Sequence, residues 1–227
     1  MNFYILVEGR RTEAKLYPAW FSILLSNYKR VKSLEEVSDQ NYYLFSANGY
    51  PSIIHTHFPN AVKDILQVNK FQYLVLALDA GDYGYEKRYE EVMSFAKKEN
   101  LLNENYKLVI LVQNVCLETW FLGNRKIISR NPYDPIYKEY LEYYNILMDD
   151  PEKMQKPKEF EGSVDSFHLD YLRKVFAEKN ITYNKNHPGH VTEKHYLDEI
   201  QKRTSDHPNH LLSFQKLIQF CNEVCNG

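Results

Sequence analysis

Four carboxylates stand directly after apolar runs of the sequence, or a few residues beyond them: Glu8, Asp79, Asp82 and Glu118. Apolar runs without polar alternation indicate buried strands, and a carboxylate at the end of such a strand loses hydration that hydrogen bonds, a cation or a metal must replace. The carboxyl ends of parallel strands meet at one edge of a sheet, where ligands bind, so we expect the four acids to meet there. Oxygen-only ligands favour Mg²⁺ or Mn²⁺ over zinc, and two such ions can clamp the attacking and leaving oxygens of a phosphodiester.

The apolar pattern also predicts the elements that must position these acids. We expect strands at residues 2–7, 41–47, 73–79 and 106–113, and helices after residue 12, around residues 52–67 and over residues 85–98. Strands that alternate with helices are typical of an α/β fold, here an open, Rossmann-like parallel sheet with helices on both faces. Pro18 and Pro59 are expected to kink, restart or interrupt the helices in which they fall.

The sequence predicts two parts, residues 1–125 and residues 126–227. From residue 126 to residue 162 the composition shifts to Tyr, Pro, Lys and Glu without a strong period, which indicates an irregular or weakly helical insertion. Helical patterning returns at residues 166–179, 192–203 and 209–225, with a loop over residues 184–190. We therefore expect a helical C-terminal part that packs on an α/β domain.

Composition excludes several classes of protein. The 28 Lys and Arg against 30 Asp and Glu give a net charge of −2, so any contact with nucleic acid must be local. Three cysteines fit a reduced interior rather than a disulfide framework. The first apolar run is too short for a signal peptide, and no stretch approaches the roughly 20 apolar residues of a membrane span. We expect a cytoplasmic protein with no membrane partner.

Two of the acidic runs resemble a known family. The run ILVEGRRTE resembles the first motif of Toprim domains, and VLALDAGD resembles their second motif, an acidic pair after a later strand. The pattern VEGxxTE, with LETWFL and HLLSF, is most similar to small stand-alone Toprim proteins near the OLD (overcoming lysogenization defect) nucleases, many of which belong to bacterial defence systems. The resemblance covers roughly residues 3–122 and implies a Toprim-like fold.

What the resemblance implies is a Mg²⁺-dependent phosphoryl-transfer site. Glu8 would match the catalytic glutamate, as a ligand or a general acid/base, and Asp79 would match the first metal-binding aspartate. The family has one residue between its two aspartates, whereas Ala80 and Gly81 separate Asp79 from Asp82. Gly81 can let the loop fold so that Asp82 still reaches the metal; otherwise the site holds one ion or is a degenerate scaffold.

Three further residues are candidates for the same site. Glu13 is expected one turn inside the first helix, where it can support a metal ligand, cap the helix or pair with Arg10, which can itself contact a phosphate. Lys185 lies in the loop YNKNHPGH, where it can neutralise charge that develops on a phosphoryl group. Zinc is the rival hypothesis for His187 and His190, joined by His195, but no cysteine is near and the spacing matches no standard site.

Each acid also has a structural alternative. Backbone amides at a helix start can satisfy Glu8, Asp82 can be an ordinary turn residue, and Glu118 can be a first-turn helix residue. The tyrosine-rich stretch at residues 133–144 is more typical of helix packing or an interface than of base stacking.

The sequence therefore predicts a Mg²⁺- or Mn²⁺-dependent nuclease, a hydrolase of phosphodiester bonds in DNA or RNA, that acts in phage defence or in nucleic-acid processing. The alternative is a catalytically weak Toprim-fold binding module, or a subunit of a larger defence complex with a protein partner such as an ATPase. A further alternative keeps the site but changes the reaction to nucleotidyl transfer or to cleavage of structured RNA. The sequence pattern does not determine the oligomeric state, and it is compatible with an oligomer.

Overall fold

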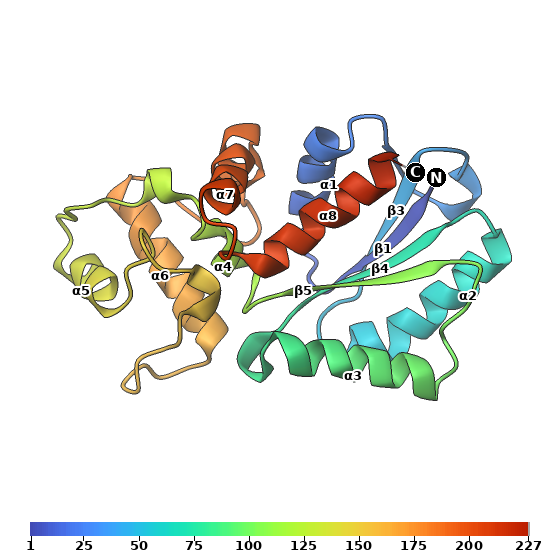
Figure 1. Ribbon diagram of the computed structural model, residues 1–227, viewed down its shortest axis with the longest axis horizontal. Helices are drawn as coiled ribbons and strands as arrows, with labels where there is room; N and C mark the ends of the chain where they lie inside the picture. Colours follow the sequence, from blue (N-terminus) through green and yellow to red (C-terminus); the bar gives the residue numbers. More distant parts are fainter. Residues whose placement is uncertain (227) are drawn as a thin grey trace. The chain divides into compact units, whose positions relative to one another are not determined.

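The protein is described by a computed structural model over residues 1–226, which form two compact units (Figure 1). The sheet unit contains Met1–Leu78, Tyr85–Val112 and the chain from Lys216 on. The helical unit contains Asp79–Gly84 and Gln113–Gln215. The division differs from the expected boundary at residue 125, because the last helix packs on the sheet while residues 113–125 pack with the later helices.

The sheet confirms the predicted α/β class. Its five parallel strands lie in the order β2-β3-β1-β4-β5. They are β1 (Phe3–Val7), β2 (Lys29–Val31), β3 (Asn41–Ser46), β4 (Tyr73–Asp79) and β5 (Lys107–Gln113). Ile5 at the centre of β1 is level with Leu44 on one side and Val75 on the other. This architecture fits a Rossmann-like fold, in which the loops after β1 and β4 leave the same edge of the sheet.

Helices cover both faces of the sheet, as predicted. On one face lie α1 (Glu13–Leu24) and α8 (Leu212–Asn226), and on the other lie α2 (Phe58–Val68) and α3 (Tyr85–Lys98) (Figure 1). Successive residues of β1 point to opposite faces: Phe3 packs with its ring centroid 5.3 Å from those of Phe21 and Phe220, whereas the Tyr4 hydroxyl donates to Asp64 of α2.

Neither proline breaks its α-helix, so the structure shows no restart at Pro18 and no interruption at Pro59. A single helix α1 runs through Pro18, with Tyr17 and Trp20 beside the proline fully buried. Pro59 lies in the first turn of α2, where a missing N–H costs nothing because that group has no partner within the helix. A π-helical turn, Ile53–His57, leads into α2.

In the helical unit, α6 (Val164–Glu178) is the central helix. Around it lie α4 (Leu117–Phe121), α5 (Pro135–Tyr143) and α7 (Lys194–Asp206). The Tyr140 ring of α5 stacks on Phe167 with a centroid separation of 5.2 Å, and Phe176 meets Tyr196 of α7 edge to face. The helix α5 falls in the stretch expected to be irregular or weakly helical, and its tyrosines pack the core of this unit. No helix formed by residues 1–226 combines the length and apolar character needed to cross a membrane.

Candidate functional site

The first predicted acid, Glu8, follows β1 in the sheet unit. Its backbone N–H donates to the Ala77 carbonyl at 3.0 Å, which extends the β1–β4 ladder one residue beyond Val7. Its own carbonyl accepts the N–H of Gly49 at 2.8 Å. The half-buried Glu8 is therefore held by backbone bonds at the carboxyl end of its strand, as the sequence predicted.

Glu13 lies one turn further, at the start of α1, and its carboxylate folds back onto the loop after β1. A Cβ on Gly9 would lie 2.3 Å from both carboxylate oxygens of Glu13, so a larger residue at position 9 would displace the end of the Glu13 side chain. The Gly9 carbonyl accepts a hydrogen bond from Ser46 Oγ at 2.9 Å. The loop is thus shaped around Glu13, while Arg10 beside it is exposed.

In the helical unit, the charges of Asp79 and Glu118 both act on the thiol of Cys116. Asp79 is the last residue of β4 and is half-buried, and Glu118 in the first turn of α4 is only 2% exposed. Burial raises the pKa of Cys116 well above its usual value, and the negative charges of Glu118 and Asp79 raise it further. Both predicted acids therefore act on one thiol, although 39 positions separate them in the sequence. Among the described residues, however, Asp79, Asp82 and Glu118 do not form a group of closely spaced ligand atoms.

Lys185 joins Glu118 from a third segment. Its Nζ lies 3.4 Å from Glu118 Oε1, and the Tyr183 hydroxyl donates to the same oxygen at 3.0 Å. The loop that carries Lys185 is shaped by a bridge between Asn184 and His187. The buried carboxylate thus has a positive charge and a hydroxyl as neighbours, and the lysine is 44% exposed.

The start of α4 is fixed by a hydrogen-bond network that the sequence did not suggest. Thr119 Oγ1 accepts the N–H groups of Val115 and Cys116 at 3.1 and 3.2 Å. Burial lowers the pKa of His168 to about 4, so the ring is neutral at pH 7 with one N–H. That proton is on Nε2, since its partner at 2.9 Å is the Met154 carbonyl, and Nδ1 therefore accepts from Thr119 at 2.8 Å.

Asp82 has a structural partner in the helical unit. Its Oδ1 accepts the N–H of Val164, the first residue of α6, at 2.8 Å. Gly81 has φ +56°, a left-handed conformation that favours glycine, and its N–H donates to the Val115 carbonyl. The left-handed Gly81 thus shapes the loop after β4, and the exposed Asp82 caps the N-terminus of α6.

The donor chemistry of these acids fits a hard divalent cation. Asp79, Asp82 and Glu118 offer carboxylate oxygens only, the ligands that Mg²⁺ and Mn²⁺ prefer. Glu118 already neutralises Lys185, so a bound metal ion would compete with the ammonium group for this carboxylate.

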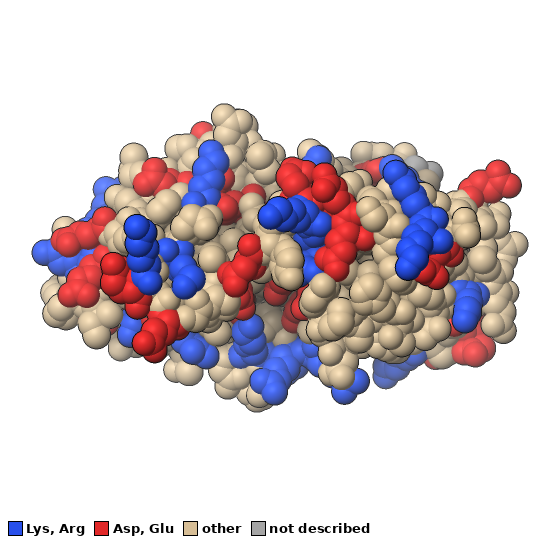
Figure 2. Space-filling view, turned by 90° about the horizontal axis from the view of Figure 1, so that it is seen from below, with Lys and Arg blue, Asp and Glu red and all other residues tan. Residues whose placement is uncertain are grey.

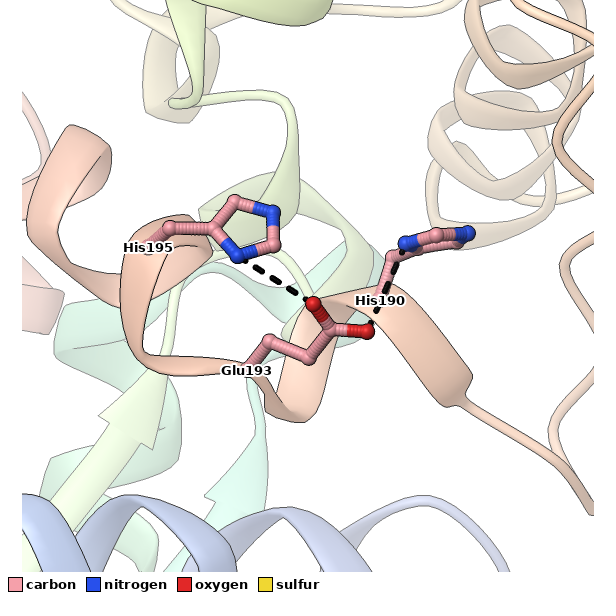
Figure 3. Close-up of side chains that lie close together, drawn as sticks. All are labelled: His190, Glu193 and His195. Carbon is pink, nitrogen blue, oxygen red and sulfur yellow. Dashed lines mark ion pairs between the residues drawn. The ribbon is translucent and has the colours of Figure 1, made fainter.

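The histidines considered for zinc separate into two groups. His187 belongs to the bridge in the loop, whereas His190 and His195 both lie beside the carboxylate of Glu193 (Figure 3). Glu193, the N-cap residue of α7, was not part of the sequence hypothesis.

Comparison of the sequence with models of known protein families found no match, and neither did comparisons with curated proteins and with solved structures.

Proposed function

We propose that the protein is a metal-dependent phosphodiesterase that cleaves nucleic acid, with Mg²⁺ or Mn²⁺ held by Asp79, Asp82 and Glu118. Glu8, at the end of β1, enters the proposal from the sequence alone, as a further ligand or the general acid/base. The observations that support the proposal are the ion pair of Lys185 with Glu118 and the charges of Asp79 and Glu118, which both act on Cys116 in the helical unit. Carboxylates that can bind a metal ion, next to a lysine that can neutralise a phosphate, are groups that catalyse phosphoryl transfer.

In this proposal the acids and Lys185 have different roles in the reaction. A bound divalent ion would supply a nucleophilic water and neutralise charge on the phosphate. Asp79 and Glu118 would hold the ion in position. The hydrogen-bond network around Thr119 fixes the start of α4, and with it the backbone of Glu118. Lys185 is half-exposed, so it can exchange the carboxylate of Glu118 for a phosphate oxygen at a small desolvation cost. There it would stabilise negative charge that develops on the phosphoryl group.

A basic pocket in the helical unit supports an anionic substrate. The pocket has a volume of about 380 Å³, and its basic lining residues are Arg125, Lys126, Arg130, Lys202 and Arg203. On the face drawn in Figure 2, basic and acidic residues are intermixed and neither sign covers the surface. The excess of cations is thus limited to this pocket. A protein with almost no net charge can bind phosphates only through such a local basic site.

Arg203 forms the floor of that pocket. Its guanidinium donates to the carbonyls of Ile146 and Asp149 at 2.8 and 2.6 Å. Burial, reinforced by the charge of Arg125, lowers the pKa of Arg203 to about 10, so the group is still charged at pH 7. Two other cations of the pocket also have partners: Lys126 Nζ lies 3.5 Å from Glu199 Oε1, and Arg125 Nη1 lies 2.7 Å from His207 Nε2. A bound phosphate would therefore compete with these partners.

The second candidate function is a binding module, or a subunit of a larger complex with a protein partner such as an ATPase, that does not cleave. It is favoured by the partners that two acids have without a metal: Glu118 is paired with Lys185, and Asp82 caps α6. In this case the carboxylates are structural, and the basic pocket binds nucleic acid without hydrolysis.

Calorimetric titration with Mn²⁺ separates the two functions. We expect the wild type to bind at micromolar to millimolar concentration, and a variant with Asp79→Asn and Glu118→Gln to lose binding while its circular dichroism is unchanged. The matched control is Glu90→Gln, an exposed carboxylate of α3. DNA and RNA are then tested side by side with Mg²⁺, Mn²⁺ and a chelator. If the wild type binds no Mn²⁺ and cleaves neither polymer, the binding module is the remaining function.

Lys185→Met is expected to change metal affinity and cleavage in opposite directions. Removing the ammonium group leaves Glu118 without its competing cation, so Mn²⁺ should bind more tightly. Cleavage should fall by about 10²-fold, since a charge that stabilises the transition state is lost. The control is Lys179→Met, an exposed lysine at the end of α6. Weaker Mn²⁺ binding, or an unchanged cleavage rate, would show that Lys185 has only a structural role.

A further inference from the structure

A second group of metal-ligating side chains lies at the start of α7, apart from the acids discussed so far. The ligand atoms of His190, Glu193 and His195 all lie within 4.8 Å of one another. His190 Nδ1 is 3.5 Å from one carboxylate oxygen of Glu193, and His195 Nδ1 is 3.1 Å from the other. Figure 3 shows both rings turned toward this carboxylate, one on each side. Two imidazole nitrogens and a carboxylate are thus gathered within the separations that the ligands of one ion can span after small side-chain movements.

The backbone that carries these ligands is already ordered. His190 belongs to the 3-10 turn Gly189–Thr192, and its carbonyl accepts the N–H of Glu193 at 3.2 Å. The Glu193 carbonyl in turn accepts the N–H groups of Tyr196 and Leu197, which begins α7. The side chains of Tyr196 and Leu197 are buried, as is that of Val191 in the turn. An ion would therefore meet three donors that need only small rotamer adjustments, which lowers the entropic cost of binding.

Lys194, the one lysine or arginine among residues 190–195, does not repel a metal ion at this site. Lys194 lies between Glu193 and His195 in sequence, but its Nζ pairs with both carboxylate oxygens of Asp198 at 2.9 and 2.7 Å. This i,i+4 pair holds the ammonium group one turn along α7. The negative charge of Glu193 is therefore available to neutralise a cation that the histidines bind.

We propose that His190, Glu193 and His195 bind a transition-metal ion, with Zn²⁺ as the best match. Two histidines and a glutamate form a donor set that zinc uses when a fourth position is left for water, whereas Mg²⁺ and Ca²⁺ select oxygen-only sites. The three side chains are 50%, 49% and 67% exposed, so the site is open to solvent. With three exposed donors the dissociation constant is on the order of micromolar, weaker than in a closed structural zinc site.

A metal on His190 would also act on the neighbouring loop. His190 closes the stretch from Tyr183 to His190, which carries Lys185, and the ion would tie this end of the loop to α7. The amides of residues 184–190 should then exchange more slowly with solvent when the metal is bound. This effect concerns the order of the loop and does not depend on whether the protein cleaves nucleic acid.

The test uses the full chain without an added histidine tag. Zn²⁺ is titrated by calorimetry, and Co²⁺ is titrated by its visible absorption, which reports the coordination geometry. We expect one ion per chain, and at least tenfold weaker binding in His190→Gln and in His195→Gln; both positions are exposed, so folding should be unchanged. His187→Gln, outside the cluster, is the matched control and should bind as the wild type does. Asp79→Asn should also keep Zn²⁺ binding, which separates this site from the proposed Mg²⁺ site.

Two outcomes would overturn the zinc proposal. The first is a wild type that binds neither Zn²⁺ nor Co²⁺ with a dissociation constant below about 1 mM. Any exposed pair of ligating side chains reaches an affinity that weak. The second is wild-type affinity in a variant that carries both His190→Gln and His195→Gln. Unchanged hydrogen exchange over residues 184–190 in the metal-bound protein would remove the proposed effect on the loop.

Discussion

Asp79→Asn is expected to slow nucleic-acid cleavage by about 10²- to 10³-fold while the protein stays folded. The change removes a charge but little volume, and Asp79 is only half-buried at the end of β4, so the sheet should tolerate it. The loss is expected in kcat, because the carboxylate would position charge in the transition state rather than bind the polymer. Single-turnover cleavage of a labelled substrate measures this directly.

The metal dependence of the same variant provides the decisive comparison. If Asp79 binds the ion, a higher Mn²⁺ concentration should restore part of the lost rate, because the site is weakened rather than removed. Glu90→Gln, which removes a carboxylate from the exposed face of α3, should cleave at the wild-type rate. A wild-type rate in Asp79→Asn would leave the proposed metal site without support.

The stability of the protein should depend on pH through Glu152, a carboxyl group buried in the helical unit. Burial raises the pKa of Glu152 to about 7, although hydrogen bonds from the N–H and hydroxyl of Ser213 lower it. The unfolded chain ionises this group near pH 4.5, whereas the folded protein keeps its proton up to about pH 7. The free energy of unfolding therefore falls by about 3 kcal/mol as the pH rises from 4.5 to 7.

His168 has the opposite effect over nearly the same interval. Its folded-state pKa of about 4 means that the unfolded chain takes up a proton first as the pH falls from 6.5, so acid destabilises the fold. Between about pH 4.5 and 6.5 the two slopes nearly cancel, and the wild type alone would show little change. The pH dependence that each group causes can be measured only in a variant that lacks one of the two groups.

Glu152→Gln isolates the carboxyl group. Urea unfolding of the wild type and the variant at several pH values gives the difference in their free energies of unfolding. We expect the wild type to lose about 3 kcal/mol relative to the variant between pH 4.5 and 7.5, with little change above pH 7.5. Exposed Glu90→Gln should give a difference that does not depend on pH. A constant difference for Glu152→Gln would mean that the group ionises as it does in the unfolded chain.

The elements that could be predicted are those with a long apolar run and clear ends. The predicted bounds of β4 and α3 agree with the structure, because the strand is apolar throughout and the turn between them contains two glycines. The edge strand β2 was missed, since it has three residues and two of them are exposed. The division into units was also missed, because contacts that join α8 to the sheet unit link residues far apart in the sequence.

The candidate site could be predicted only where local sequence carries the signal. Glu8 and Asp79 were selected as candidates because strand ends in a parallel sheet are where ligands bind. Thr119 and His168 were not, because a hydrogen bond between residues 49 positions apart leaves no trace in spacing or periodicity. Lys185 was selected for its loop, but its pairing with Glu118 is a product of tertiary structure.

The carboxylate of Glu13 occupies the space that any side chain at position 9 would need. The two positions are therefore coupled during sequence change: a residue larger than glycine at position 9 would turn the flexible end of the Glu13 side chain away from the loop. If Glu13 has a functional role, Gly9 is retained because it leaves the carboxylate of its neighbour in place. A glycine with ordinary backbone angles can thus matter for the position of another side chain rather than for its own conformation.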